Sequence, residues 1–346
     1  MNDQNLVEMI ASVAQAFGPS GNEQNVREVI EPLLSGFVDE VRVDPLGNLI
    51  AVKKGTGKKI MLAAHMDEIG VMVTYIDEKG YLRFGAVGGV RPHYALGTRV
   101  IFENGTVGSM WYEEKLESMK DLSFDRMFID IGAASREEAE TMVKVGDMGV
   151  FCGEAVENNG RLISKALDDR AGCAVLIALA RTLPETTNEI YFVFTVQEEV
   201  GIRGAKTAAW GILPDVALAV DVTGTGDLPE SKHMAVAVGK GPTIKIKDSS
   251  VICHPDVVER LRACAERAEI PVQYEVLVAG GTDAGSIHLT AGGIPTGAVS
   301  LPTHFIHSPS EMISIADLKG AVDLIAEFVK DDPETDVAEG SVSDND

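Results

Sequence analysis

The chain has 346 residues, which is long for one domain and comfortable for two. It carries 53 acidic and 30 basic residues, a formal net charge of −23. That balance argues against nucleic acid and against an anionic membrane surface, because both attract clustered Lys and Arg. The apolar runs are far shorter than the roughly 20 residues of a membrane span, and no signal peptide is visible at the N-terminus. The four cysteines are scattered without a CxxC pattern, so we expect reduced thiols in a cytoplasmic protein.

The first part of the chain mixes helical and extended patterns. Helical periodicity covers residues 5–16 and 23–35, and Ser20 or Asn22 is expected to cap the second helix. Two short extended runs follow, and a continuous apolar run at 59–64 has the character of a buried strand.

The sequence pattern changes between about residue 69 and residue 163. One helix signal stands out there, with Ser135 as N-cap and Glu138 at the capping-box position. Around it, short β-rich runs alternate with Gly and Asn turns at 71–76, 81–87, 98–102, 106–112 and 127–131. Such closely spaced strands predict a small β domain or barrel.

After residue 163 helices and strands alternate. Helical patterns cover 169–183, 204–210, 256–268, 284–291 and 315–329, and strand patterns cover 189–196, 216–222, 273–276 and 296–300. This alternation predicts an α/β domain with a largely parallel sheet. We therefore expect one α/β domain, residues 1–68 and 164–330, interrupted by a β-rich insertion at 69–163. The last sixteen residues, 331–346, carry seven acids and no base, and predict a disordered tail.

Polar clusters follow five of the predicted strands, and standard motifs such as GxSxG, HExxH and the Walker A loop are missing. The carboxyl ends of strands in an α/β sheet form the ligand-binding edge. Five polar clusters at one edge would seldom arise by chance. The clusters are His65-Met66-Asp67-Glu68, Asp168-Asp169, Glu198-Glu199, Asp221 and His307.

These residue types suit divalent metal ions. Imidazole and carboxylate together bind Zn²⁺, Co²⁺ or Mn²⁺. Two ions roughly 3.5–4 Å apart need a bridging carboxylate and end ligands, and they can activate water and hold a developing oxyanion. A hydrolase also needs a proton carrier beside the metals, and the pair Glu198 and Glu199 could divide these tasks.

Six motifs occur in an order that identifies a family. They are AHMDEIG (64–70), ALDDRAG (166–172), VQEEVG (196–201), DVT (221–223), GGTDAG (280–285) and IHSP (306–309). With them the sequence resembles the M42 metallo-aminopeptidases, which include deblocking, tetrahedral and glutamyl aminopeptidases and relatives once labelled endoglucanases. The resemblance covers almost the whole chain. One departure is His304-Phe305, where many members have an Arg-Tyr or similar pair.

The resemblance implies a ligand set. His65 and Asp221 would bind one metal, Glu199 and His307 would bind the other, and Asp168 would bridge the two. The ions would be Zn²⁺ or Co²⁺, with Mn²⁺ as a further candidate.

The resemblance also implies two catalytic roles. Glu198 would be the general base that deprotonates the metal-bound water and later protonates the leaving amine. Asp67 would accept the second imidazole N–H of His65 and so orient the ring. The peptide bond between Asp168 and Asp169 would be cis.

The implied fold is a zinc-peptidase-like α/β/α sandwich with a mixed, largely parallel sheet and a small barrel-like or PDZ-like dimerisation domain. The implied activity is release of N-terminal residues from short unblocked peptides. Family members often build tetrahedral twelve-subunit particles from dimers, so a homo-oligomer is expected.

Several alternatives stay open. A metal-dependent glycoside hydrolase and a non-catalytic scaffold stabilised by metal are the rival functions. Asp169 could cap a helix while Asp168 binds metal. The stretch Gly280–Asp283 is either a wall of the substrate site or a simple turn before a helix, and His304 offers a second imidazole near His307. The residue preference and the physiological metal do not follow from the sequence.

Overall fold

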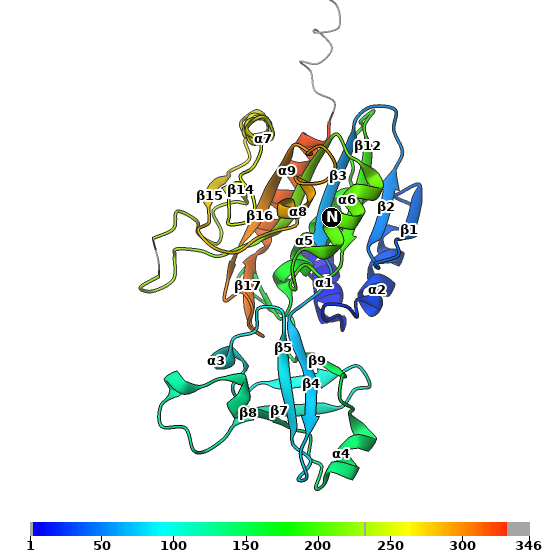
Figure 1. Ribbon diagram of the computed structural model, residues 1–346. Helices are drawn as coiled ribbons and strands as arrows, with labels where there is room; N and C mark the ends of the chain where they lie inside the picture. The colour runs from blue at the N-terminus through cyan, green and yellow to red at the C-terminus, as the bar shows by residue number, and fades with distance from the viewer. Residues whose placement is uncertain (1–2, 232, 331–346) are drawn as a thin grey trace, which may run out of the picture.

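The structure is a computed structural model that describes residues 3–231 and 233–330; the acidic stretch at 331–346 lies outside the described residues. A large α/β lobe carries a small β barrel that projects from one end (Figure 1). Within the described ranges, none of the helices combines the length and apolarity needed to cross a membrane.

A mixed sheet forms the centre of the large lobe. Its order is β1 (Glu40–Val43), β2 (Leu49–Lys53), β12 (Glu189–Thr195), β3 (Lys59–His65), β13 (Val216–Thr223), β16 (Thr296–His304), β17 (Glu311–Ser314), β11 (Arg161–Ser164) and β10 (Val156–Asn158). The strands β12, β3, β13 and β16 run parallel, whereas those at both edges are antiparallel. In addition, β14 (Thr243–Lys247) pairs with β16 and with β15 (Gln273–Val276).

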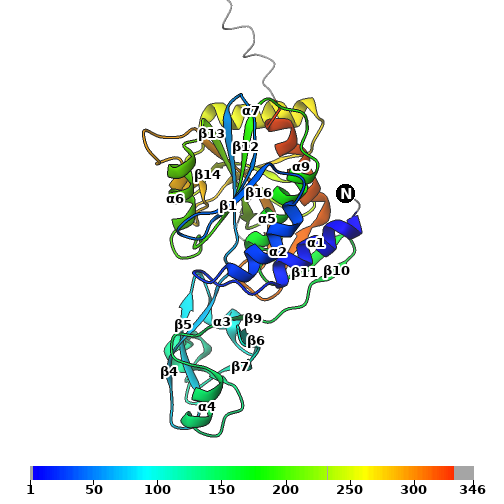
Figure 2. The same cartoon turned by 90° about the vertical axis from the view of Figure 1, so that its right-hand side faces the viewer.

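Helices cover both faces of this sheet, as Figure 2 shows. One face packs against α1 (Asp3–Gln15), α2 (Gln24–Leu34), α5 (Leu167–Arg181), α7 (Pro255–Arg267) and α9 (Ile315–Phe328), and the other against α6 (Arg203–Ile212) and α8 (Ala284–Ile287). Alternate residues of β3 divide between the two cores: Ile60 and Leu62 face α5, and Met61 and Ala63 face α6. The predicted α/β/α sandwich with a mixed sheet is confirmed.

The small lobe is a closed barrel with its own apolar core. Around the barrel the strands follow the order β4 (Gly70–Ile76), β5 (Leu82–Val87), β8 (Met127–Asp130), β7 (Val107–Tyr112), β6 (Arg99–Phe102) and β9 (Met148–Phe151). Short helical segments connect them: α3 (Pro92–Ala95), η1 (Met119–Asp121), η2 (Phe124–Arg126) and α4 (Arg136–Met142). Helix α4 begins as predicted after Ser135, whose hydroxyl accepts the N–H of Glu138.

Two strands within the expected insertion range belong to the large lobe. Strands β10 and β11 fall inside 69–163 for most of their length, yet β11 pairs with β17 at the edge of the large sheet. The sequence pattern predicts none of the strands β9, β10, β14 and β17, and the last two belong to the large sheet. Each is short, with only two apolar residues (TIKIK and EMIS), and each is stabilised by pairing with neighbouring strands.

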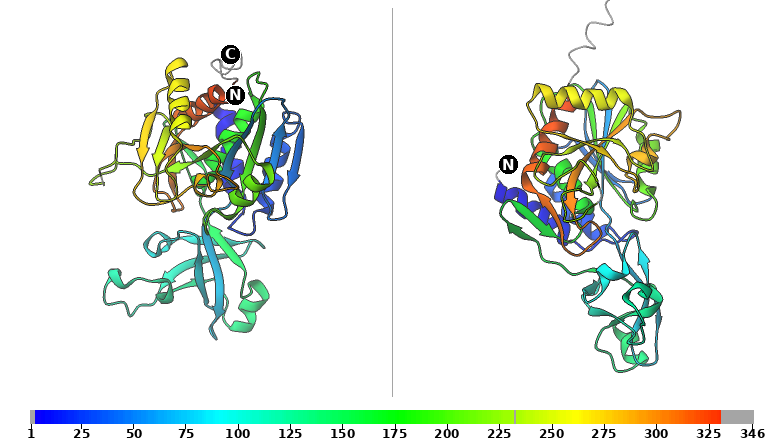
Figure 3. Two further views of the ribbon diagram at one scale, coloured as in Figure 1. Left: turned by 45° about the horizontal axis from the view of Figure 1, so that its top comes forward. Right: turned by 90° about the vertical axis from the view of Figure 1, so that its left-hand side faces the viewer.

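The barrel joins the large lobe at the edge of the sheet where the polar clusters gather. Only residues 66–69 separate β3 from β4, so the carboxyl end of β3 points toward the barrel. The views in Figure 3 show the two lobes meeting at this junction. The candidate site therefore lies beside the boundary between the lobes.

Candidate metal centre

His65 ends β3 and meets two carboxylates from neighbouring segments. Its Nε2 lies 3.1 Å from Oδ1 of Asp168 and 4.0 Å from Oδ1 of Asp221. Strand register explains the second contact, because Ala63 of β3 pairs with Ala219 of parallel β13 and each side chain lies two residues further on. The three side chains are buried, and their donor atoms lie within 4.8 Å of one another.

A second group of donors shares Asp168 with the first. Nε2 of His307 lies 3.2 Å from Oδ2 of Asp168 and 3.1 Å from Oε1 of Glu199. These atoms also lie within 4.8 Å of one another. The two oxygens of Asp168 thus face different imidazoles, with Oδ1 toward His65 and Oδ2 toward His307.

Asp169 fixes the local backbone around the shared carboxylate. The backbone of Asp168 and Asp169 is non-helical, so the regular part of α5 begins after them. Oδ1 of Asp169 accepts the N–H of Gly172 at the start of this regular part, and Oδ2 accepts the N–H of His65 at 3.1 Å. The peptide bond between Asp168 and Asp169 is cis. Asp169 therefore caps the helix and ties it to the end of β3, while Asp168 points into the group of donors.

Asp67 makes more contacts than the sequence predicts. Its carboxylate accepts the N–H groups of Glu198 at 2.9 Å and Glu199 at 3.1 Å, and the hydroxyl of Ser20 at 2.6 Å. Nδ1 of His65 lies 3.0 Å from the backbone oxygen of Asp67 but 3.6 Å from its carboxylate. The backbone oxygen, rather than the expected carboxylate, is therefore the closer partner of the ring.

Ser20 contacts Asp67 and does not cap the second helix, a role that the sequence predicts for Ser20 or Asn22. Helix α2 has Glu23 as its N-cap residue, and no side chain makes a capping hydrogen bond there. Glu23 instead accepts the N–H of Gln197, just before the Glu198-Glu199 pair. The segment that precedes α2 thus supports the candidate site.

Burial and crowding of acids dominate the electrostatics. Burial raises the pKa values of Glu198 and Asp221 well above their usual range, although nearby His65 lowers them. For Glu199, burial is the larger cause and the charge of Asp168 the second, and both raise the pKa. Burial opposes the charge on His307 as well, yet its hydrogen bonds to the neighbouring carboxylates raise its pKa to about 11. Three buried or partly buried carboxylates therefore share this site with two imidazoles.

This donor set fits two divalent cations. Each group offers one imidazole and two carboxylates, the ligand types that Zn²⁺, Co²⁺ and Mn²⁺ accept. Burying several charged carboxylates together costs free energy unless positive charge compensates for them. Two cations would supply that charge. Glu198 belongs to neither group although it lies next to Glu199, so its carboxylate is free for another task.

His304 and the loop at 280–283 have contacts of their own. Nε2 of His304 lies 2.9 Å from Oδ1 of Asp227, so this ring pairs with a carboxylate outside both donor groups. Asp283 begins α8, and its Oδ2 accepts the hydroxyl of Thr195 at 2.5 Å. Thr195 ends β12, three residues before Glu198, so the loop contacts the strand that precedes the candidate base.

The barrel lobe contributes two glycines that the sequence did not indicate. A side-chain carbon at Gly89 would overlap Nδ1 and Cε1 of the His307 ring, and one at Gly88 would lie 3.0 Å from Cβ of Glu199. The segment after β5 thus packs directly on two predicted ligands. No periodic or motif signal points to these contacts, because they arise from docking of the two lobes.

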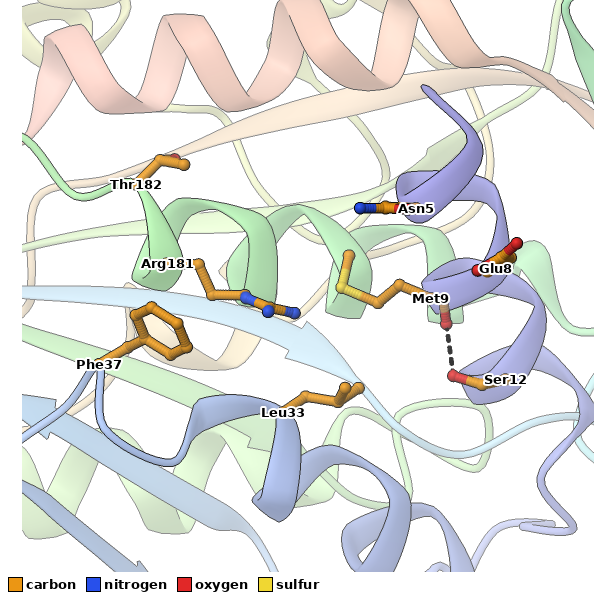
Figure 4. A pocket seen from close by; sticks show the side chains of 8 residues that line it. All are labelled: Asn5, Glu8, Met9, Ser12, Leu33, Phe37, Arg181 and Thr182. Atoms are coloured by element: carbon orange, nitrogen blue, oxygen red, sulfur yellow. Dashed lines mark hydrogen bonds between the residues drawn. The ribbon is translucent and has the colours of Figure 1, made fainter. Parts of the chain in front are cut away.

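A separate hollow lies between α1, α2 and the end of α5 (Figure 4). It encloses about 580 Å³, and the guanidinium of Arg181 lies over the ring of Phe37 at 5.0 Å. None of the predicted ligands is among its lining residues. This hollow is therefore separate from the candidate site.

Known proteins share this fold and much of this sequence. The model of the family described as M42 glutamyl aminopeptidase matches residues 47–324. A protein of Acetivibrio thermocellus, whose name marks it provisionally as an aminopeptidase, is 58% identical over 95% of this chain and 100% of its own. The chain therefore belongs to the M42 family of aminopeptidases, which are hydrolases that act on peptide bonds.

Solved structures agree with this assignment. A TET aminopeptidase from a marine-sediment archaeon of the Thaumarchaeota is 38% identical, with a TM-score of 0.92 over 97% of this chain and 99% of that one. The TET1 peptidase of Pyrococcus horikoshii, described as assembling into a tetrahedron or a large octahedral shell, is 35% identical, with a TM-score of 0.85 over 94% and 99%. A Thermotoga maritima structure titled as an endoglucanase is also similar, at 33% identity and a TM-score of 0.79 over 93% and 96%.

Proposed function

We propose that this chain is a dinuclear metal-dependent aminopeptidase that releases N-terminal residues from short unblocked peptides. The observation that carries the proposal is the position of Asp168, whose two oxygens face two separate imidazoles. His65 and Asp221 would hold one ion, and Glu199 and His307 the other. Zn²⁺ and Co²⁺ are the favoured ions, with Mn²⁺ as a third.

The bound ions would act as Lewis acids and lower the pKa of water at the site. Glu198 would take a proton from the attacking water as its oxygen adds to the peptide carbonyl carbon. The same carboxyl would then give that proton to the amide nitrogen as the C–N bond breaks. Burial raises the pKa of Glu198, which favours a group that both accepts and returns a proton.

The surrounding acids support the proposed preference for a free N-terminus. A protonated α-amino group brings one positive charge to a site where the charges of Asp221 and Asp283 add to burial in raising the pKa of Glu198. A blocked or internal amide brings none. This charge balance supports exopeptidase rather than endopeptidase action.

The test compares two adjacent residues. Glu198→Gln should lower kcat on an aminoacyl chromogenic substrate by about 10²–10⁴-fold while both ions stay bound, because only the proton carrier is lost. Glu199→Gln should lose bound metal as well as turnover. Metal content by elemental analysis separates the two results, and full turnover of Glu198→Gln would show that the proposed mechanism is wrong.

A glycoside hydrolase is the second candidate, because one similar structure carries an endoglucanase title. Glycosidases place two carboxylates on either side of the scissile bond and seldom need two metals. Here two groups, each with its own imidazole, share the carboxylate of Asp168, which favours the peptidase. Cleavage of a cellulose-type substrate by metal-free protein would favour the glycosidase, and metal-dependent folding without any hydrolysis would favour a scaffold.

The assembly is part of the proposal. The barrel would be the dimerisation domain, and dimers would build a tetrahedral dodecamer like the particles described for the TET1 peptidase. Exposed aromatic side chains on the barrel, Tyr75 and Trp111, support an interface there. Analytical ultracentrifugation with and without chelator would distinguish a dimer from a dodecamer.

We also propose a cytoplasmic location, which the free cysteines favour.

A further inference from the structure

Glu311 lies between the two loops that carry Asp168 and His307. It is the first residue of β17 and pairs with Ser164, the last residue of β11. The chain that leaves β11 reaches Asp168 four residues later, and the chain that enters β17 passes through His307 four residues earlier. Strand register therefore places the Glu311 side chain where both loops converge.

The carboxylate of Glu311 accepts one backbone N–H from each loop. Oε2 accepts the N–H of Asp168 at 2.9 Å, and Oε1 accepts the N–H of His307 at 2.8 Å. The residue is 2% exposed, so water does not compete for these bonds. A single rigid carboxylate thus fixes the distance between the backbones of the shared donor and of one end donor.

His307 needs such support because its backbone is strained. Its φ angle is +64°, in the left-handed region that residues with a side chain seldom adopt. Phe305, two residues earlier, has a φ angle of +60°. The hydrogen bond from the His307 N–H to Glu311 holds the loop in this conformation and so directs the imidazole toward Asp168 and Glu199.

We propose that Glu311 is a positioning residue that sets the affinity of the ion held by Asp168, Glu199 and His307. The inference rests on the proposed two-ion function. It predicts an asymmetric effect, because His65 and Asp221 are supported by β3 and β13 and have no contact with Glu311 among the described hydrogen bonds.

The experiment titrates metal-free protein with Co²⁺ by calorimetry and resolves the two binding events. In Glu311→Gln, one N–H would face the new NH₂ group, so one loop loses its acceptor. We expect the affinity for the ion at His307 to fall about 10–100-fold and the affinity for the other ion to fall less. Glu311→Asp keeps the charge, but its shorter side chain cannot reach both loops, so it should show the same asymmetry.

A matched control is Asp317→Asn. Asp317 is also buried and accepts two backbone N–H groups, from Gly239 at 2.6 Å and Gly241 at 2.8 Å, but it belongs to neither donor group. Urea unfolding of the metal-free proteins compares the structural cost of the two substitutions. The inference is wrong if both Glu311 variants bind both ions as the wild type does, if both ions weaken equally, or if Asp317→Asn gives the same asymmetry.

The wild-type titration tests the proposed function separately. If the wild type binds two ions and the Glu311 variants are unchanged, only the positioning role fails. If the wild type binds one ion, the two-ion function fails, and the positioning role is then decided by whether that ion weakens in Glu311→Gln.

Discussion

The backbone N–H of Glu198 donates a hydrogen bond to Oδ1 of Asp67 at 2.9 Å. The other oxygen of Asp67 accepts the N–H of Glu199 at 3.1 Å. One buried carboxylate therefore holds the turn that presents both the proposed base and a proposed ligand. The role of Asp67 extends beyond the ring of His65, to which it also contributes its backbone oxygen.

Replacing Asp67 by Asn should disturb this turn. An amide keeps one acceptor oxygen, and its NH₂ group would face the N–H of either Glu198 or Glu199. We expect kcat to fall about 10–100-fold with a smaller change in KM, measured on an aminoacyl chromogenic substrate. Asp77→Asn is the control, since Asp77 accepts two backbone N–H groups in a barrel turn. A wild-type kcat in Asp67→Asn would contradict this assignment.

Gly89→Ala tests whether the barrel lobe shapes the site. The added methyl would overlap the His307 ring, so the ring or the loop must move. Displacement of a reacting group by about 1 Å can cost about 100-fold in rate, and we expect a loss of that order in kcat. The control is Gly211→Ala in α6, where nothing beyond the local helix backbone lies within 4 Å of the new carbon. Equal activity of the two variants would exclude a contribution from Gly89.

Local pattern predicts a large part of this site. The end of an apolar run places His65, and the parity of two parallel strands brings Asp221 to the same face. These relations need only strand length and alternation, which the sequence displays directly. The α/β domain and the small β domain follow from the same kind of pattern, whereas the sandwich arrangement and the ligand roles follow from the family resemblance.

Other parts of the site depend on contacts that no local pattern encodes. Glu311 lies in a strand of four residues whose position is fixed by pairing with β11 and β16. Gly89 matters because the lobes dock against each other, and Ser20 because its hydroxyl reaches Asp67 rather than a helix end. Each of these residues acts on a segment far away in the sequence, so only the assembled fold reveals its role.

Removal of metal should destabilise the protein by mass action. Free ion at 1,000 times Kd stabilises the folded state by roughly 4 kcal/mol per site, and a chelator removes this contribution. We expect the Tm of loaded protein to fall by several degrees with chelator and to recover with Co²⁺. Glu199→Gln should show a smaller chelator effect, because one of its sites is already weakened. An identical Tm with and without chelator would argue against bound structural ions.

Asp283 provides a pH-dependent prediction. Burial raises the pKa of this carboxyl from 3.8 to about 6, although the Thr195 hydroxyl lowers it, and Oδ1 has no hydrogen-bond partner. An acid whose pKa is higher in the folded state binds its proton more tightly there. Below pH 3.8 this group therefore does not change the free energy of unfolding. As pH rises toward 6, ionised Asp283 lowers that free energy progressively, by roughly 3 kcal/mol above pH 6.

Asp283→Asn removes this titration while keeping an oxygen that can accept the Thr195 hydroxyl. In metal-free protein the variant should gain stability relative to the wild type as pH rises, by at least about 1 kcal/mol between pH 5 and pH 8. Urea unfolding at both pH values measures the difference. Asp256→Asn serves as the control, because the Asp256 side chain is 92% exposed. If the stability difference between Asp283→Asn and wild type is the same at pH 5 and pH 8, the prediction is wrong. Asp283 would then have an ordinary pKa, and the fold would not favour its uncharged form.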